Sequence, residues 1–278
     1  MSSWDELQHL EVDGYRLAYR RGGSGAPVVL VHGVTTSSFI WRRVFPLLTP
    51  RYDVLAVDLL GCGRSDKPPA ADLSVRAQTS LLQNFLSRLD LGPVHLVGHD
   101  VGGAIAQLLA VRSPSQLASV AVVNTVGYDY WPVQPIVTLR TPVVRQIAMA
   151  TLDLGMLKVI VRRGLNHKDR ATAELLGHFH EEIGADASRK PFLQFLRSLN
   201  NRDLMDIVPE LPKIKLPFLI VRGDGDVYLS PEISRRLHHD IEGSKLVHIE
   251  TAGHFVQEDE PELLAQALTD HFGNRSDG

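Results

Sequence analysis

Short apolar runs alternate with longer helix-like patterns along most of this chain of 278 residues. The runs lie at residues 27–31, 52–57, 94–97, 117–123, 216–221 and 245–249, and the helical patterns at 39–48, 74–89, 103–111, 231–239 and 261–272. The run at 27–31 is short and continuously apolar, which is typical of a strand buried on both faces, and the other runs are similar. Strands and helices that alternate in this way form a mostly parallel sheet with helices on both faces, so we predict an α/β fold.

The alternation stops between residues 123 and 216. Residues 128–212 show helix-like patterns and loops interrupted by prolines, which predicts a helical cap inserted between two strands. We therefore expect a core domain of residues 1–127 and 213–278, with residues 128–212 as its cap. The stretch 140–170 combines basic and apolar side chains. Because an inserted cap must bury an apolar stripe, we interpret this stretch as an amphipathic lid rather than a membrane-touching face.

The composition limits the partners that this chain is expected to have. Hydrophobic residues make up 44% of the chain and charged residues 22%, the usual range for a globular protein. A net charge of -3 offers no basic surface for nucleic acid. No apolar run reaches the roughly twenty residues of a membrane span, and no signal peptide is recognisable. Since Cys62 is the only cysteine, no intrachain disulfide can form, and we expect a cytoplasmic setting. We expect a monomer or homodimer without a nucleic-acid or membrane partner.

The segment Gly98-His99-Asp100-Val101-Gly102 fits the G-x-S-x-G nucleophile elbow at every position except the centre, where aspartate replaces serine. It follows the apolar run at 94–97 and precedes a helical pattern, which is the strand–turn–helix context that the motif requires. The positive end of that helix favours an ionised Asp100. A carboxylate that attacks a saturated carbon bearing a leaving group forms an alkyl ester. We therefore predict that Asp100 is a nucleophile in covalent catalysis.

Cleavage of such an ester by water requires a base and an oxyanion hole. His254 follows the last predicted strand, and the chain order nucleophile, acid, histidine is the one expected for this elbow. We predict Asp226 as the acid that orients His254, with Asp224 as its rival, because a loop position further from the strand end reaches over to the histidine. The backbone N–H groups of Val34 and Val101 are the predicted oxyanion donors.

Metal and cofactor sites are not indicated. His178 and Glu182 would share one face of a helix, but a third ligand and the zinc-protease pattern are both missing. We interpret this segment as an exposed cap helix. Cys62 lies between two glycines without an evident base, and we interpret it as a small residue in a turn. The expected partners are therefore a small-molecule substrate and water, with no cofactor and no metal.

Several motifs together resemble the α/β-hydrolase fold, from about residue 10 to residue 272. They are Val31-His32-Gly33, the segment 58–66, the elbow, the segment 223–226 and Gly253-His254-Phe255. The aspartate at the elbow resembles the haloalkane dehalogenase and epoxide hydrolase branch. Residues 35–42 and 65–68 are similar to haloalkane dehalogenases in particular. The resemblance implies a hydrolase with an Asp-His-Asp triad and a cap over the active site.

The chain departs from both groups at the positions that stabilise the leaving group. Haloalkane dehalogenases typically have tryptophan after the nucleophile, and many have asparagine after the His-Gly pair. This chain has Val101 and Val34 there, whose side chains donate no hydrogen bond. Fluoroacetate dehalogenases usually have an arginine directly after the nucleophile, and this chain has Val101 there as well. Epoxide hydrolases typically have proline where this chain has Thr35, and they use cap tyrosines, for which only Tyr128 and Tyr130 are placed suitably.

We predict a two-step hydrolase that acts on a small, mostly apolar molecule. Epoxide opening is favoured because Tyr128 and Tyr130 are candidate proton donors. Carbon–halogen cleavage is the alternative, with Trp41 or Trp131 as substitute donors to the halide. A third hypothesis is an esterase or lactonase in which Asp100 acts as a base. A fourth is a binding protein that kept the fold and lost turnover.

Overall fold

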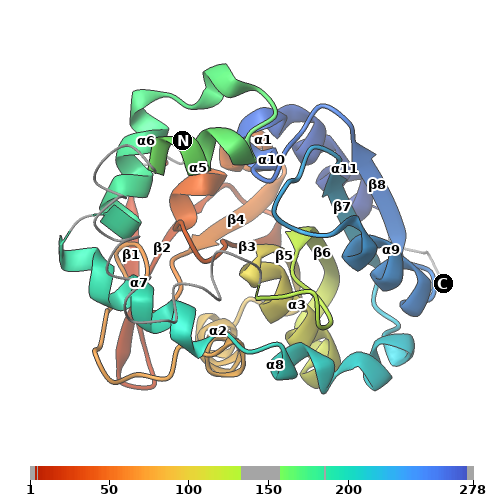
Figure 1. The fold of residues 1–278 in the computed structure, drawn as a ribbon. Helices are drawn as coiled ribbons and strands as arrows, with labels where there is room; N and C mark the ends of the chain where they lie inside the picture. The colour runs from red at the N-terminus through yellow and green to blue at the C-terminus, as the bar shows by residue number, and fades with distance from the viewer. Residues whose placement is uncertain (1–3, 5, 133–156, 185, 274–278) are drawn as a thin grey trace.

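The computed structural model describes residues 4, 6–132, 157–184 and 186–273 of the chain (Figure 1). These residues form an eight-stranded sheet in the order β1-β2-β4-β3-β5-β6-β7-β8. The strands are β1 (Leu7–Val12), β2 (Tyr15–Gly22), β3 (Ala26–Val31), β4 (Tyr52–Val57), β5 (Val94–Asp100), β6 (Leu117–Thr125), β7 (Phe218–Gly223) and β8 (Lys245–Ile249). β1, β2 and β4 pair antiparallel, whereas all the other pairs are parallel. The predicted α/β fold with a mostly parallel sheet is confirmed.

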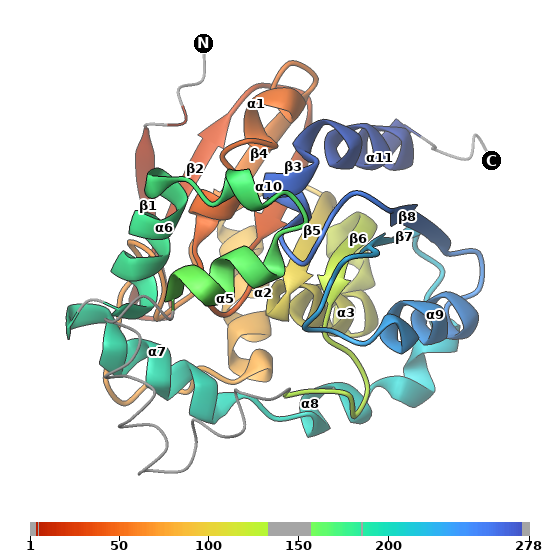
Figure 2. The same cartoon turned by 45° about the horizontal axis from the view of Figure 1, so that its top comes forward.

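Helices cover both faces of this sheet (Figure 2). The core helices are η1 (Ser38–Trp41), α1 (Phe45–Leu48), α2 (Val75–Leu89), α3 (Val101–Arg112), η2 (Pro114–Gln116), α9 (Pro231–Asp240), α10 (Val256–Asp259) and α11 (Pro261–Gly273). α2 and α3 pack together on one face, and α1 and α11 pack together on the other. The central strands are therefore enclosed: Val29, Leu96 and Val120 pair across β3, β5 and β6 and are all fully buried. This rigid centre fixes the carboxyl end of β5, where Asp100 lies.

Two predicted elements differ from the observed ones because of proline. The pattern at 39–48 predicts one helix, but η1 and α1 are separate helices, since Pro46 lacks an N–H and fits only in the first turn of α1. The run at 216–221 predicts a strand from residue 216, but β7 begins at Phe218, after Pro217. Pro217 still accepts a hydrogen bond from the N–H of Val120 through its carbonyl.

Between β6 and β7 the described residues are helical or in loops. They form α5 (Leu157–Gly164), η5 (Lys168–Arg170), α6 (Ala173–Phe179), η6 (His180–Gly184), α7 (Asp186–Ser198), α8 (Arg202–Met205) and η7 (Val208–Lys213). Figures 1 and 2 show α5 to α8 outside the two layers of core helices. The division into a core and a cap at residues 128–212 stays a prediction.

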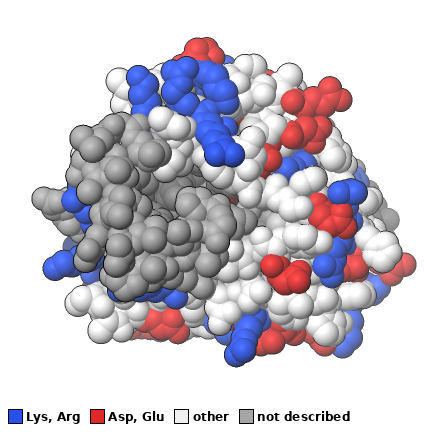
Figure 3. Space-filling view, in the orientation of Figure 1, with Lys and Arg blue, Asp and Glu red and all other residues white. Residues whose placement is uncertain are grey.

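The predicted lid at 140–170 lies only partly within the described residues, because residues 133–156 fall outside them. In α5, Leu157 and Val161 are buried, whereas Lys158, Arg162 and Arg163 are exposed, so this helix has the expected amphipathic character. Basic side chains gather over α5 in the space-filling view (Figure 3). Within the described part of the chain, no helix combines the length and the apolar character needed to cross a membrane.

Candidate active site

Asp100 ends β5 at a sharp turn that leads directly into α3. Its backbone has φ 53° and ψ -116°, a region that costs free energy for a non-glycine residue and that clusters at functional sites. The turn requires small neighbours. A Cβ on Gly102 would lie 2.4 Å from the carbonyl oxygen of Val31, and a Cβ on Gly98 would lie 2.1 Å from that of Gly102. The glycines of the motif therefore let strand and helix approach closely enough to form the elbow.

Two backbone N–H groups point at the carboxylate of Asp100. The N–H of Val34 donates to its Oδ2 at 3.1 Å, and the N–H of Val101 also donates to this carboxylate. Gly33 makes the approach possible, because a Cβ there would lie 2.6 Å from the same Oδ2. Both N–H groups thus occupy the position predicted for oxyanion donors.

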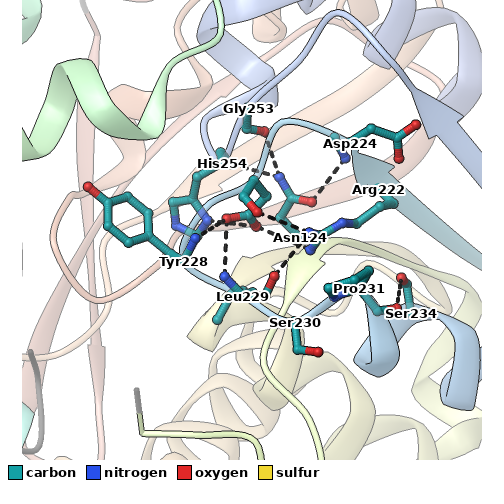
Figure 4. Close-up of polar contacts among 12 residues, drawn as sticks. Asn124, Arg222, Asp224, Tyr228, Leu229, Ser230, Pro231, Ser234, Gly253 and His254 are labelled. Atoms are coloured by element: carbon teal, nitrogen blue, oxygen red, sulfur yellow. Dashed lines mark hydrogen bonds and ion pairs between the residues drawn. The ribbon is translucent and has the colours of Figure 1, made fainter. Parts of the chain in front are cut away.

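His254 is held by hydrogen bonds to its ring and to its backbone (Figure 4). Its Nδ1 lies 3.1 Å from Oδ2 of Asp226, and its backbone N–H donates to the carbonyl of Gly164 at 2.7 Å. Its carbonyl accepts bonds from Nε2 of His99 and from Nδ2 of Asn124, each at 3.0 Å. Because Asp226 engages Nδ1, the lone pair of the neutral ring lies on Nε2.

Asp226 lies in the loop that follows β7, and its side chain is fully buried. Its Oδ1 accepts the backbone N–H groups of Tyr228 at 2.8 Å and Leu229 at 3.2 Å, while Nη1 of Arg222 lies 3.4 Å from its Oδ2. Figure 4 shows Arg222, Tyr228 and Leu229 close to His254. Both oxygens of the carboxylate are thereby fixed, which fixes the imidazole in turn.

Asp224, the rival acid, lies on the other side of the same loop. Its Oδ1 is 2.6 Å from Nδ1 of His248, and both side chains are partly exposed. The structure therefore brings Asp226, and not Asp224, to the ring of His254.

Burial and neighbouring charges shift the pKa values of Asp100, Asp226 and His254. Burial raises the pKa of Asp100, although His254 and the two N–H groups act in the opposite direction. The positive end of α3 favours the carboxylate, as predicted from the sequence, but burial opposes it and has the larger effect. Burial also opposes a charge on Asp226 and on His254, but their mutual attraction outweighs it. The pKa of Asp226 is lowered, and that of His254 is raised above its ordinary value of 6.5.

Asn124 and His99 are site residues that the sequence did not reveal as such. Asn124, at φ 38°, donates to the carbonyls of Gly253 and His254 and accepts the N–H of Gly223 at 3.0 Å. It thus joins the ends of β6 and β7 to the loop of His254. Burial, followed by the nearby charge of His254, lowers the pKa of His99 to about 3, so its ring is neutral. A polar residue at the end of a buried parallel strand is the signal that could have revealed Asn124.

The two candidate tyrosines contact α9. The hydroxyl of Tyr128 donates to Oδ2 of Asp240 at 2.8 Å, and the guanidinium of Arg236 lies 3.9 Å from the centre of its ring. Tyr130 is 37% exposed, and its hydroxyl is hydrogen-bonded to Arg236. The proton of Tyr128 is therefore already engaged.

Unlike the two tyrosines, the two candidate tryptophans have a polar atom without a hydrogen-bond partner in the described part of the chain. Trp41 and Trp131 are both buried, and neither indole Nε1 has an acceptor within the described part of the chain. Trp131 lies in the loop that leaves β6, whose first residue, Val126, donates its N–H to the carbonyl of Asp100 at 3.4 Å. Both indoles therefore offer a buried N–H donor.

The interpretation of residues 178–182 as an exposed helix is right for His180 and Glu181, which are exposed, but wrong for His178. Its ring stacks on Phe39 with centroids 4.0 Å apart, and its Nε2 lies 3.1 Å from Oγ of Ser37. Glu182 also turns to the core and accepts the N–H of Gly63 at 2.9 Å. The helical spacing placed both side chains on one face, but it could not show that this face packs on the core. Among the residues that the structure describes, no group of three or more His, Cys, Asp or Glu side chains could hold a metal ion.

A parallel sheet with this strand order and a nucleophile elbow after its central strand defines the class of α/β hydrolases. The chain belongs to the alpha/beta hydrolase family, whose sequence model matches residues 28–267. The resemblance seen in the motifs is thereby confirmed.

Among the relatives, an uncharacterised protein of Mycobacterium tuberculosis is 32% identical and aligns with 92% of this chain and 77% of its own length. Haloalkane dehalogenase 2 of Mycobacterium tuberculosis is 27% identical over 93% of this chain and 92% of its own. Bifunctional epoxide hydrolase 2 of Sus scrofa is 25% identical over 92% of this chain and 53% of its own. The crystal structure of Cfl2 from Burkholderia cenocepacia matches with a TM-score of 0.84 and 25% identity, covering 96% and 95% of the two chains.

Proposed function

We propose that this protein hydrolyses a small, mostly apolar molecule in two steps through an ester of Asp100. In the first step Oδ1 of Asp100 attacks a saturated carbon, and the bond from that carbon to its leaving group breaks. The single observation that carries this proposal is the position of Asp100 at the strained elbow with its Oδ2 held by the N–H of Val34. Since that bond engages Oδ2, Oδ1 is the oxygen available for attack.

In the second step water attacks the carbonyl carbon of the new ester. Nε2 of His254 takes the proton from water, and Asp226 stabilises the imidazolium that forms. The N–H groups of Val34 and Val101 stabilise the negative oxygen of the tetrahedral intermediate. The intermediate then expels the alkoxide, which takes the proton back from the His254 imidazolium and leaves as the alcohol. The Asp100 carboxyl group loses its proton to water and returns to the carboxylate, and no step of this scheme needs a cofactor or a metal.

Carbon–halogen cleavage is the reaction that the described donors support best. A halide leaves as an anion and needs only N–H donors, and the indole N–H of Trp131 is buried without an acceptor among the described residues. Epoxide opening is the second candidate and needs a proton donor. Tyr128 is engaged with Asp240, and burial, followed by that hydrogen bond, raises the pKa of its hydroxyl, so it is a poor acid. Tyr130, partly exposed, is the remaining tyrosine donor.

A substrate panel tests the proposal. The purified protein would be incubated with matched pairs of bromoalkanes and terminal epoxides that carry the same apolar chain. We expect halide release in step with alcohol formation from the bromoalkanes. Diol formation from the epoxides alone would assign the second candidate. Reversible binding without product from any member of the panel would contradict a hydrolase and support a binding protein.

The pKa shifts predict how the two steps depend on pH. His254 must be neutral to act as base, and its pKa is raised, so ester hydrolysis slows as pH falls through a value above that of free histidine. Esterification neutralises Asp100, so its charge no longer raises the pKa of His254. The charge of Asp226 remains and still raises that pKa. Ester formation requires only an ionised Asp100, whose ordinary pKa of 3.8 is raised by burial.

Rapid quenching followed by mass spectrometry, between about pH 5 and pH 9, would measure both steps. We expect the fraction of protein present as the ester to rise as the pH is lowered, because the second step slows before the first. The opposite result would be a constant fraction of ester across this range, with the rates of ester formation and ester hydrolysis declining together. It would contradict the assignment of His254 as a base that acts only in the second step.

A further inference from the structure

The buried carboxylate of Asp259 joins two segments that lie far apart in the sequence. Asp259 ends α10 and is 1% exposed. Its Oδ2 accepts the backbone N–H groups of Gly253 and Asn166, each at 2.8 Å, and its Oδ1 accepts that of His167 at 2.9 Å. Two of these donors follow α5, and the third belongs to the residue directly before His254. One side chain therefore fixes the loop of His254 to the segment 164–167.

Other contacts between the same two segments leave little space for movement. The N–H of His254 donates to the carbonyl of Gly164 at 2.7 Å, and Nδ2 of Asn166 donates to the carbonyl of Thr251 at 2.8 Å. A Cβ on Gly253 would lie 2.4 Å from the carbonyl oxygen of Gly164. The backbones are thus in direct contact, and the bonds to Asp259 set how they are aligned.

A carboxylate accepts hydrogen bonds from N–H groups more strongly than a neutral group does, and a buried N–H that loses its acceptor is costly. Loss of the Asp259 carboxylate would therefore move the N–H groups of Gly253 and Asn166 away from their present positions. The ring of His254, one residue after Gly253, would move with them. A displacement of about 1 Å in a catalytic group can cost roughly 10²-fold in rate.

We propose that Asp259 is a positioning residue for His254, which couples the segment 164–167 to the base and so sets the rate of ester hydrolysis. This role rests on the proposed two-step function. Because His254 acts only in the second step, the effect of Asp259 falls on that step and spares the first. A residue that served stability alone would affect the two steps alike.

Asp259→Asn tests this role, because asparagine has the same size but places an NH₂ group against an N–H donor. We expect ester hydrolysis to slow by about 10- to 100-fold, with ester accumulation and an unchanged rate of ester formation. The acid limb of kcat should move to lower pH, because a looser contact with Asp226 raises the pKa of His254 less. Glu262→Gln removes an exposed carboxylate in the first turn of α11, away from both segments, and should behave as the wild type.

Asn166→Ala is a milder second variant at an exposed position, in case Asp259→Asn does not fold. It should slow ester hydrolysis in the same direction and leave ester formation unchanged. Hydrolysis at the wild-type rate in the folded variants, or equal slowing of both steps, would overturn the role of Asp259. If His254→Gln forms ester while Asp259→Asn behaves as the wild type, only this inference fails. If no variant ever forms ester, the two-step function itself fails, and the inference with it.

Discussion

His254→Gln is expected to slow turnover sharply and to leave most of the protein as an ester of Asp100. Glutamine has a similar length and can still contact Asp226, but it takes no proton from water. General base catalysis contributes about 10²- to 10⁴-fold, so steady-state turnover should fall by that factor. Attack by Asp100 on a saturated carbon needs no base and should continue. Intact-mass and peptide mass spectrometry would detect one alkyl group per chain, located on Asp100.

His239→Gln is the matched control, because that side chain is exposed on α9. It should turn over at the wild-type rate and accumulate no ester. The role of His254 would be contradicted if His254→Gln kept its turnover. It would also be contradicted if turnover were lost without any increase in mass, although the wild type converts the same substrate.

Asp100→Asn is expected to abolish both ester formation and turnover. Asparagine has nearly the same shape and tolerates the positive φ of this turn, so the fold should be retained. An amide is a poor nucleophile, and loss of a nucleophile costs several orders of magnitude in kcat, about 10⁴-fold or more. Product assays with the substrate identified in the panel would measure this loss, and calorimetry would show that substrate still binds.

Asp90→Asn is the control for the effect of asparagine at a residue with positive φ. Asp90 also has a positive φ, of 49°, but it caps α2 at the surface. Its substitution by asparagine should change neither turnover nor ester formation. Full turnover in Asp100→Asn would exclude Asp100 as the nucleophile.

The fold was largely predictable because the central strands are mostly buried on both faces. Mostly apolar runs are typical of such strands, and the observed β4 has the predicted bounds. The edge strand β8, which is partly exposed, also has the predicted bounds. The ends of other elements depend on neighbours that no local pattern contains. β5, for example, continues for three polar or small residues beyond its apolar run, up to Asp100, because Thr125 of β6 still pairs with it.

The proposed active site was predictable where its residues follow strands in a fixed order. Asp100 ends a strand, Asp226 and His254 each follow one, and parallel strands present these ends at one edge of the sheet. Asp259 and Asn124 were missed because their partners are backbone groups of distant segments. A hydrogen bond from residue 166 to residue 259 has no signature in the sequence around either residue.

The donors to the leaving group were the least predictable part. Tyr128 has the right chemistry and lies near the start of the predicted cap, but an aspartate 112 residues later accepts the hydrogen bond from its hydroxyl. His178 was misjudged for a similar reason, since Phe39 and Ser37 of the core cover it. Whether a polar side chain is free to contact the substrate depends on its hydrogen-bond and packing partners, and these lie far away in the sequence.

A single turnover in water enriched in oxygen-18 tests the covalent ester most directly. With protein in excess over substrate, water attacks the carbonyl carbon of the ester, so the alcohol leaves with an oxygen that belonged to Asp100. The new oxygen-18 atom should then be found in the Asp100 side chain by peptide mass spectrometry, and the product should be unlabelled. Oxygen-18 in the product together with an unlabelled Asp100 would show that water attacks the substrate directly and would contradict the ester.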